Sequence, residues 1–319
     1  MRARIIAPVL LGLSAAVLSA CGDDSTDSAA SGAAETITVT DSRGETEVPR
    51  NPDSVVVFDM GVLDTLDTLG VDAVTGVAQG GRIPAYLEKY ASDDYVNVGD
   101  LFEPDLEAIP ATEPDLIIVG GRSSQAYDSL TENFPDAAVL DISVDERDYL
   151  DSVEANTETL AAIFGKEAEA EKLLDAQEQR IDAVEEKAEK AGNALVLLTS
   201  GGEITAYSTG SRFGFLHDEF GFAPATGELG DAESRHGEAV SFEFIRETNP
   251  DHLFVVDRDA AIGETGDSAE EILDNELVRS TNAWKNKQVT YVDPTAWYIV
   301  VGGLSALDTV IDEIDAALS

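Results

Sequence analysis

An internal repeat is the feature that most restricts what this chain can fold into. The segment Asp105–Arg122, DLEAIPATEPDLIIVGGR, recurs without a gap as Ser241–Arg258, SFEFIRETNPDHLFVVDR. Seven of the 18 paired positions are identical, and each copy has the pattern of a helix, a Pro-Asp turn, a buried strand and a final Arg. Because the copies begin far apart in a chain of 319 residues, they predict two similar α/β lobes.

Short apolar runs rich in β-branched residues supply the expected strands of both lobes. Helical patterns separate these runs, as in Val62–Leu69, which ends at Gly70. This alternation predicts parallel sheets. The expected strands are 54–58, 116–119 and 138–142 in the first lobe, and 194–198, 253–256 and 289–292 in the second.

A long helix is expected between the lobes. The segment Lys166–Ala191 contains no Gly or Pro, consists mostly of Glu, Ala, Lys, Leu and Gln, and lies between Gly165 and Gly192. At about 1.5 Å per residue it would extend over about 39 Å, more than a usual crossover helix. Its length and charge favour an exposed helix that joins the lobes. The predicted regions are a first α/β lobe at 35–148, a helical region with the linker helix at 149–191, and a second α/β lobe at 192–319.

The first 34 residues are predicted to target and tether the chain. A short basic start precedes the apolar run Ile5–Ala20, which is too short for a comfortable membrane span and is typical of a secretory signal at residues 1–20. Residues 21–34 are rich in Asp, Ser, Ala and Gly, which predicts a flexible tether. The sequence LSAC at 18–21 resembles a bacterial lipoprotein box, which implies cleavage before Cys21 and lipid attachment to its sulfur. An ordinary signal peptide with a chance cysteine is the alternative.

The charge balance restricts the partners. The chain has 63 acidic and 20 basic residues, a formal net charge of −43, so nucleic acid and anionic membrane surfaces are poor partners. Apolar residues make up 43%, which indicates a folding chain and not an acidic disordered tail. A single cysteine excludes an intramolecular disulfide. Three His are too few for a zinc or manganese site built on several imidazoles.

Arginines occur mainly in loops and at the expected ends of strands. Arg122 and Arg258 end the two copies of the repeat. Since ligands of open parallel sheets gather beyond the carboxyl ends of the strands, both lobes would present an Arg to a cleft between them. Arg is suited to anionic oxygens because its planar group offers several donors. The alternative is that each of these Arg pairs with one of the many carboxylates. The other such residues are Arg82, Arg212 and Arg235.

Six motifs together carry a resemblance to a known family. The chain resembles the lipoprotein substrate-binding components of ferric-siderophore ABC importers, and most closely the group that takes ferric catecholates, petrobactin and related tetradentate ligands. The resemblance covers essentially all of the mature chain. It implies two Rossmann-like α/β lobes joined by a single long α-helix, with the ligand cleft between the lobes. The motifs are GSRFG at 210–214, LHDEFG at 216–221, RHG at 235–237, VVDR at 255–258, ILDN at 272–275 and YVDPTAWY at 291–298.

The family pattern assigns ligand contacts to five positions of this chain. Arg122, Arg212 and Arg258 would surround the catecholate oxygens. A tetradentate siderophore leaves two iron positions open, and the resemblance implies that His236 and Tyr298 fill them. Ferric iron is a hard cation that prefers oxygen donors and accepts imidazole, which agrees with this assignment.

Further family features concern the cleft and the partner. Tyr127 and Arg82 could line the cleft. Glu107 and Glu243 occupy equivalent positions of the repeat, and the resemblance implies that one acidic residue in each lobe docks onto the permease of the ABC transporter. Exposed helix surface is the alternative for these two residues. We expect a monomer without an intrinsic cofactor, whose iron arrives as a siderophore complex, on the outer face of the cell membrane.

Two other functions are less well supported by the residues. Haem or a corrinoid could be the ligand of a related importer component, although haem would need a wider apolar cleft. An enzyme on a similar fold is disfavoured, because the chain lacks a G-x-S-x-G elbow, a G-x-x-x-x-G-K-[ST] loop and a G-x-G-x-x-G motif after a strand. We therefore expect a binding protein and not an enzyme.

Overall fold

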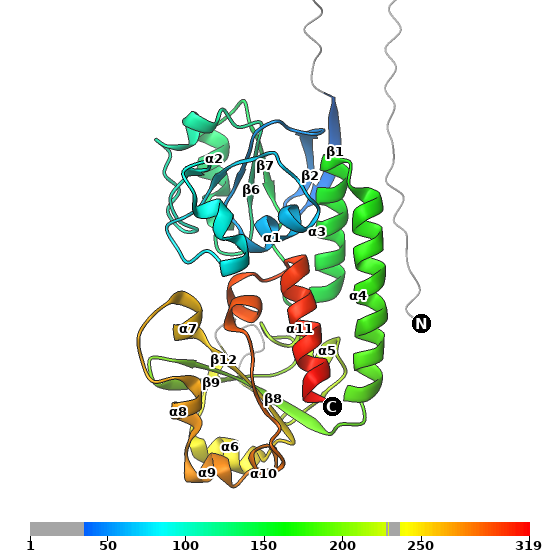
Figure 1. Cartoon of the computed structure of the whole chain (residues 1–319), viewed down its shortest axis with the longest axis vertical. Helices are drawn as coiled ribbons and strands as arrows, with labels where there is room; N and C mark the ends of the chain where they lie inside the picture. The colour runs from blue at the N-terminus through cyan, green and yellow to red at the C-terminus, as the bar shows by residue number, and fades with distance from the viewer. Residues whose placement is uncertain (1–34, 228, 230–236) are drawn as a thin grey trace, which may run out of the picture. The chain divides into compact units, whose positions relative to one another are not determined.

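The first lobe is built on a five-stranded parallel sheet, seen in a computed structural model that describes residues 35–227, 229 and 237–319 (Figure 1). In order across the sheet, the strands are β5 (Val96–Asn97), β4 (Val74–Val77), β3 (Val55–Val57), β6 (Leu116–Val119) and β7 (Ala138–Asp141). Every residue of β3 and β6 is buried, as expected for a parallel sheet covered on both faces. Strands β3, β6 and β7 confirm three predictions. The sequence does not reveal β4, which contains a glycine, or the two-residue β5.

Short helices and one hairpin complete the first lobe. The helix α1 (Met60–Thr68) confirms the prediction for 62–69 and begins two residues earlier, because the Asp59 carboxylate accepts hydrogen bonds from the N–H groups of Gly61 and Val62. The hairpin formed by the antiparallel strands β1 and β2 was not predicted, and its strand β2 packs against β7. The remaining elements are β1 (Thr36–Asp41), β2 (Gly44–Pro49), α2 (Tyr127–Asn133) and the 3-10 helices η1 (Ala85–Ala91), η2 (Ile109–Thr112) and η3 (Ser124–Ala126).

The second lobe contains a mixed sheet, which corrects the expectation of parallel strands alone. Its order is β11 (Glu238–Ala239), β9 (Glu203–Tyr207), β8 (Asn193–Ser200), β12 (His252–Asp257) and β13 (Val289–Tyr291), with β10 (Ala223–Pro224) also paired to β8. Strands β8, β12 and β13 are parallel, as predicted. Strand β9 returns antiparallel to β8 through Gly201 and Gly202, whose φ angles are 58° and 81°. Two consecutive positive φ angles are typical of a tight hairpin turn, and glycine adopts them without strain.

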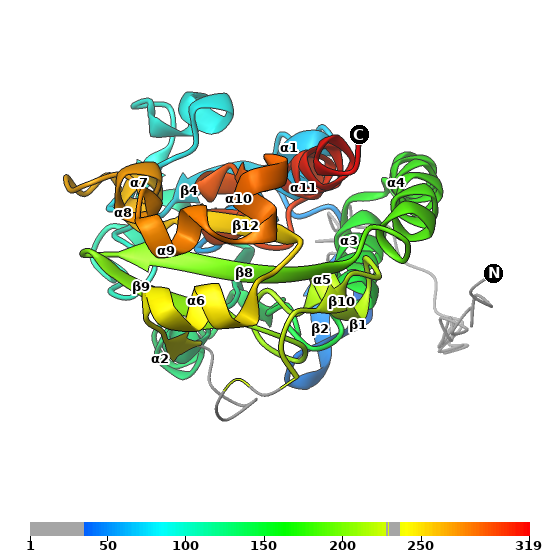
Figure 2. The same ribbon diagram turned by 90° about the horizontal axis from the view of Figure 1, so that it is seen from below.

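Helices cover both lobes. Figure 2 shows β8 crossing the view between α6 and α11. The five-residue π-helix η4 lies between β13 and α11, and π-helices are rare but frequent at functional sites. The elements of the second lobe are α5 (Phe215–Asp218), α6 (Phe242–Thr248), α7 (Arg258–Ile262), α8 (Ala269–Leu273), α9 (Glu276–Arg279), α10 (Asn282–Asn286), η4 (Thr295–Ile299) and α11 (Leu304–Ala317).

Two helices, not one, connect the sheets. The chain leaves β7, forms α3 (Tyr149–Phe164), turns at Gly165 and forms α4 (Glu167–Ala188) before β8 begins. The helix α4 confirms the prediction for 166–191 and ends three residues earlier. It packs against α3 and α11, and Figure 1 shows the three side by side. Both helices lie within the predicted helical region 149–191. Because α4 buries one face on its neighbours, it is not the exposed helix that its charge predicts.

The repeat seen in the sequence has the same structural role in both lobes. Strand β6 lies between β3 and β7, and β12 lies between β8 and β13. At equivalent positions just before these strands, Asp115 accepts a hydrogen bond from the N–H of Ser54, and Asp251 accepts one from the N–H of Asn193. Each aspartate therefore ties its own strand to the start of the neighbouring strand. The helix before the strand is a 3-10 helix in the first copy and an α-helix in the second.

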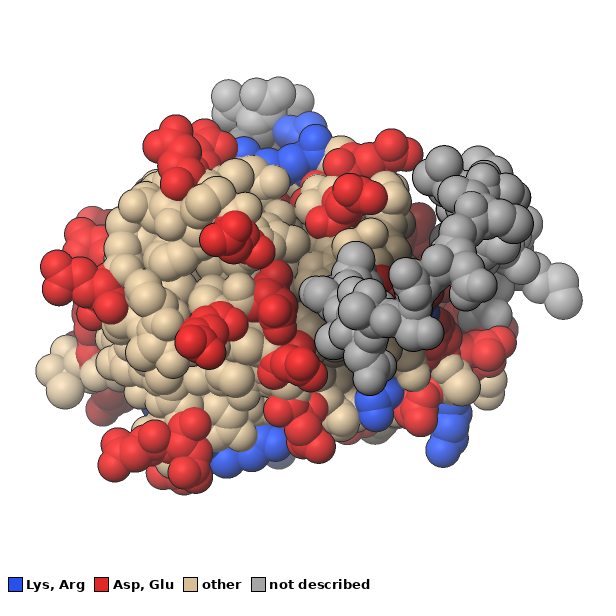
Figure 3. All heavy atoms as spheres, turned by 90° about the horizontal axis from the view of Figure 1, so that it is seen from above, with Lys and Arg blue, Asp and Glu red and all other residues tan. Residues whose placement is uncertain are grey.

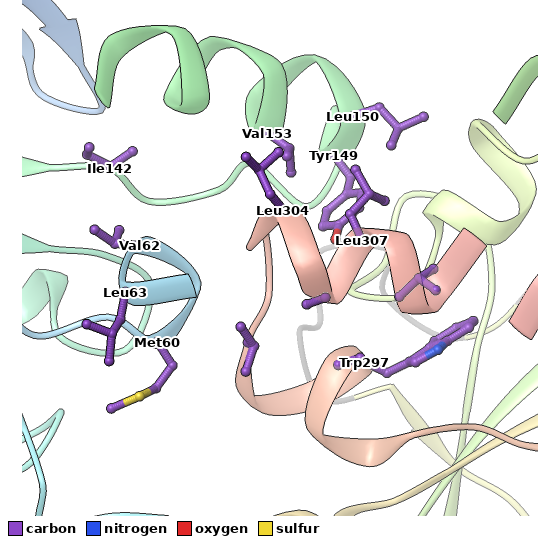
Figure 4. Close-up of a cluster of buried hydrophobic side chains, with 14 of the residues drawn as sticks. Met60, Val62, Leu63, Ile142, Tyr149, Leu150, Val153, Trp297, Leu304 and Leu307 are labelled. Atoms are coloured by element: carbon purple, nitrogen blue, oxygen red, sulfur yellow. The ribbon is translucent and has the colours of Figure 1, made fainter. Parts of the chain in front are cut away.

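The C-terminal helix α11 packs against the first lobe. Figure 4 shows Leu304 and Leu307 of α11 beside Tyr149 and Val153 of α3, within an apolar cluster that also contains residues of α1. Asp64 of α1 accepts hydrogen bonds from the N–H groups of Ser305 and Ala306 at the start of α11. These contacts hold the C-terminal helix to the first lobe.

Among the described residues, none of the helices combines the length and the apolar character needed to cross a membrane.

Candidate functional site

Tyr298 is the point at which three predicted arginines meet. Arg122 Nη2 and Arg212 Nη2 donate to its carbonyl oxygen, at 2.7 and 3.0 Å. Arg258 Nε donates to its hydroxyl oxygen at 3.1 Å. The structure therefore brings together four of the residues that the sequence analysis assigns to the ligand.

The fold explains why these residues converge. Two glycines, Gly120 and Gly121, separate the end of β6 from Arg122. Arg258 is the first residue after β12. The carboxyl ends of these two central strands thus supply one arginine from each lobe, as the repeat predicts. Arg212 lies in the loop after β9, and Tyr298 belongs to the π-helix η4 after β13.

The guanidinium groups also surround the ring of Tyr298. The Cζ atoms of Arg212, Arg122 and Arg258 lie 4.1, 4.9 and 6.0 Å from the ring centroid. Cations at such distances are attracted by the ring electrons. The tyrosine is half-buried, so these contacts are only partly screened by water.

The charges shift the pKa values in this cluster. Burial alone would raise the pKa of Tyr298, but the hydrogen bond from Arg258 and the charges of the three arginines outweigh it and lower that pKa. Burial, together with the charge of Arg122, lowers the pKa of Arg212. The hydrogen bond to Tyr298 raises the pKa of Arg258. The arginines therefore make the Tyr298 hydroxyl more acidic than that of an ordinary tyrosine.

The site has donor capacity left for an anionic ligand. The Nε atom of Arg212 is buried and makes no hydrogen bond to the described residues. A buried donor without a partner costs free energy that a ligand oxygen could recover. In contrast, acidic side chains are scattered over the face shown in Figure 3, where basic side chains are few. The three arginines are thus a local positive centre in a strongly acidic protein.

Serine and aspartate side chains support two of the arginines. In the second lobe, Arg258 Nη1 donates to Ser200 Oγ at 2.9 Å, and Ser200 in turn donates to Asp259. In the first lobe, the N–H of Gly121, next to Arg122, donates to Ser143 Oγ at 2.9 Å. None of these supporting residues was predicted from the sequence. Ser200 lies two residues beyond the predicted strand 194–198, and nothing in the sequence marks its side chain as a partner of Arg258.

Arg82 and Tyr127 lie outside the Tyr298 cluster. Arg82 is exposed, and its Nη1 donates to the carbonyl oxygen of Ala260 in α7 at 2.7 Å. It therefore joins a first-lobe loop to the second lobe, at the helix α7 that directly follows β12. Tyr127 begins α2, where the guanidinium of Arg43 lies 4.2 Å from its ring centroid.

Glu107 and Glu243 are both exposed, as a docking role would require. Glu107 lies in a turn before η2, where its N–H donates to the carboxylate of Asp105. Glu243 lies in the first turn of α6. Three residues of the sequence analysis, namely His236, Arg235 and Cys21, lie outside the described residues.

Comparison with known proteins identifies relatives over nearly the whole chain. The model of the periplasmic binding protein family matches residues 55–296. The petrobactin-binding protein YclQ of Bacillus subtilis (strain 168) is 41% identical over 311 residues, which cover 96% of this chain and 96% of that protein. The ferric-anguibactin-binding protein FatB of Vibrio anguillarum (strain ATCC 68554 / 775) is 33% identical over 274 residues, which cover 85% of this chain and 84% of that protein.

Solved structures agree with these matches. The crystal structure of YclQ has a TM-score of 0.84 and 40% identity, covering 89% of this chain and 99% of that one. The periplasmic catecholate-siderophore binding protein VctP of Vibrio cholerae has a TM-score of 0.81 and 33% identity, covering 88% of this chain and 100% of that one. The fold described above is therefore the fold of these binding proteins.

Proposed function

The chain belongs to the periplasmic binding protein family, and from this premise we propose that it captures an anionic ferric catecholate siderophore and delivers it to an ABC permease for iron uptake. Its relatives are solute-binding proteins and not enzymes. Their names specify petrobactin, ferric anguibactin and a catecholate siderophore as ligands, which supports the ligand class proposed here.

The convergence of Arg122, Arg212 and Arg258 on Tyr298 is the observation that carries the proposal. A catecholate complex of ferric iron is anionic, and its oxygens accept hydrogen bonds. In the structure, the guanidinium groups of Arg122 and Arg212 each donate one hydrogen bond to the Tyr298 carbonyl oxygen. We expect the siderophore oxygens to take over these donors in a cleft between the lobes, with Arg82 and Tyr127 at its margins.

Tyr298 has a second role in the proposal, because a phenolate is a strong ligand for ferric iron. The positive charges around its hydroxyl favour that phenolate. A tetradentate siderophore leaves two iron positions open, and Tyr298 and His236 would complete the coordination. A hexadentate tris-catecholate needs neither residue. The relative importance of the two residues should therefore depend on ligand denticity.

Two further parts of the proposal concern location and delivery. Periplasmic binding proteins act outside the cytoplasm, which agrees with the predicted export signal. We propose that a lipid on Cys21 anchors the protein to the outer face of the cell membrane. Glu107 and Glu243, exposed at equivalent positions of the repeat, would each contact one half of the permease.

Fluorescence titration tests the proposed ligand. Trp297 is adjacent to Tyr298 in the chain, so a ferric complex bound at the arginines should quench its emission. We expect ferric bis-catecholate and tris-catecholate to quench at lower concentration than haem. The His236→Ala and Tyr298→Phe variants should weaken the bis-catecholate more than the tris-catecholate. Absence of quenching by every ferric catecholate would contradict the function, and tighter binding of haem would favour the alternative ligand.

A further inference from the structure

We propose that Ser200 and Asp259 are positioning residues that hold the guanidinium of Arg258 in place for the ligand. This inference rests on the proposed function and concerns the same site. It goes beyond that function, because neither residue is expected to touch the siderophore. Both act through Arg258.

Two hydrogen bonds fix the plane of the Arg258 guanidinium. Its Nη1 donates to Ser200 Oγ at 2.9 Å, and its Nε donates to Tyr298 Oη at 3.1 Å. These bonds leave Nη2 without a hydrogen bond to the described residues. A planar group held at two of its three nitrogens cannot rotate freely, so the direction of its remaining donor is set before a ligand arrives.

Asp259 determines how Ser200 is oriented. Its Oδ1 accepts a hydrogen bond from Ser200 Oγ at 3.2 Å, so the hydroxyl hydrogen points toward the carboxylate. The lone pairs of Ser200 are then available to Arg258. Asp259 Oδ1 also lies 3.8 Å from Arg258 Nη1, which adds a charge attraction.

The backbone fixes Asp259 itself. Its Oδ2 accepts a hydrogen bond from the N–H of Gly201 at 2.7 Å, in the tight turn between β8 and β9. The residue is only 7% exposed. Since a buried carboxylate is costly unless it is paired and hydrogen-bonded, this position is defined by its partners. Strand β8, its turn and the start of α7 thus form one rigid support for Arg258.

The expected benefit of this support is a smaller entropic cost of binding. Immobilising a long, flexible side chain costs about 0.5–1.5 kcal/mol, and a residue that is already held avoids most of that cost. The same interval corresponds to an affinity change of about 2- to 12-fold. Loss of the support should therefore weaken binding modestly, and only while Arg258 is present.

A double-mutant cycle tests the inference with ferric bis-catecholate as the probe. Ser200→Ala should weaken binding about 3- to 10-fold in the wild-type background. In the Arg258→Ala background the same change should have an effect of less than about 2-fold, because there is no guanidinium left to position. Asp259→Asn should show the same dependence on Arg258. Ser200→Thr, which keeps a hydroxyl, should recover affinity to within about 2-fold of wild type.

A control separates positioning from general loss of stability. Ser54→Ala removes the Ser54 Oγ hydrogen bond to the Thr112 carbonyl, of 2.7 Å, at the opposite end of the first sheet. This variant should lose stability and keep its affinity. Equal losses from Ser200→Ala in both backgrounds, or no loss in either, would overturn the positioning role alone. Absence of wild-type binding to every ferric catecholate would overturn the proposed function and this inference together.

Discussion

The two arginines of the repeat are equivalent in sequence and are held in different ways. Arg258 is fixed within its own lobe, by Ser200 and the Tyr298 hydroxyl. The guanidinium of Arg122 instead reaches from the first lobe to the Tyr298 carbonyl. In the first lobe the support acts on the backbone, through the bond from Gly121 to Ser143. Arg258 is therefore already oriented for a ligand, whereas Arg122 must first break a hydrogen bond that connects the two lobes.

The largest expected effect is on stability and concerns Asp64, which binds the start of α11 to the first lobe. It tests whether this contact influences ligand affinity. Burial outweighs the hydrogen bonds from Ser305 and Ala306 and raises the pKa of Asp64 to about 6. An ordinary aspartate titrates near 3.8, so the folded protein binds this proton more tightly than the unfolded chain. The resulting stabilisation is complete below about pH 4 and is lost as the pH rises through 6.

We therefore expect Asp64→Asn to abolish a pH-dependent part of the stability. Relative to the variant, the wild type should lose about 3 kcal/mol of unfolding free energy between pH 4 and pH 7. Urea denaturation of both proteins at four pH values measures this difference. Affinity for ferric bis-catecholate at pH 7 should stay unchanged. A large change in affinity would show that the contact between Asp64 and the start of α11 is coupled to the ligand site.

The second effect compares the two arginines directly. Arg258→Ala should weaken ferric bis-catecholate binding about 30-fold, because it removes a positioned, charged donor. Arg122→Ala should cost about 10-fold, since wild-type Arg122 must break its bond to the Tyr298 carbonyl before it can bind the ligand. Calorimetric titration of both variants measures the order. The reverse order would contradict the difference drawn between the lobes.

The smallest effect concerns the backbone support of the first lobe. Asp141 is buried and accepts hydrogen bonds from the side chains of Ser143 and Ser124. Asp141→Asn should lower the free energy of unfolding by about 2 kcal/mol and weaken ligand binding by less than about 3-fold. Thermal unfolding and fluorescence titration of this variant check both values. An affinity loss larger than that of Asp259→Asn would mean that the two lobes support their arginines alike.

The sequence predicts the parts of the site that the repeat defines. The positions of Arg122 and Arg258 follow from strand ends, since a parallel sheet places those ends at one edge. Tyr298 could be identified only through the family resemblance, because a lone tyrosine in a helical turn has the pattern of a core residue. Ser200 was missed because a serine becomes informative only when its hydrogen-bond partners are known.

Other features of the fold depend on packing that the sequence does not reveal. The antiparallel strand β9 depends on a two-glycine turn, which the sequence analysis overlooked among 26 glycines. The sequence made the helix α4 look exposed because half of its residues are charged. Its buried face consists of a few widely spaced residues, such as Gln177, whose side-chain amide donates to the Leu304 carbonyl. Such tertiary contacts decide which face of a charged helix is covered.

The most direct test of the account is the affinity of ferric bis-catecholate for the wild type and for the Arg122→Gln/Arg258→Gln double variant. These substitutions remove one positive charge from each lobe and leave polar, shorter side chains. We predict that the double variant binds about 100-fold or more weakly at equal stability. Equal affinity of the two proteins would contradict the claim that the paired arginines capture the ligand.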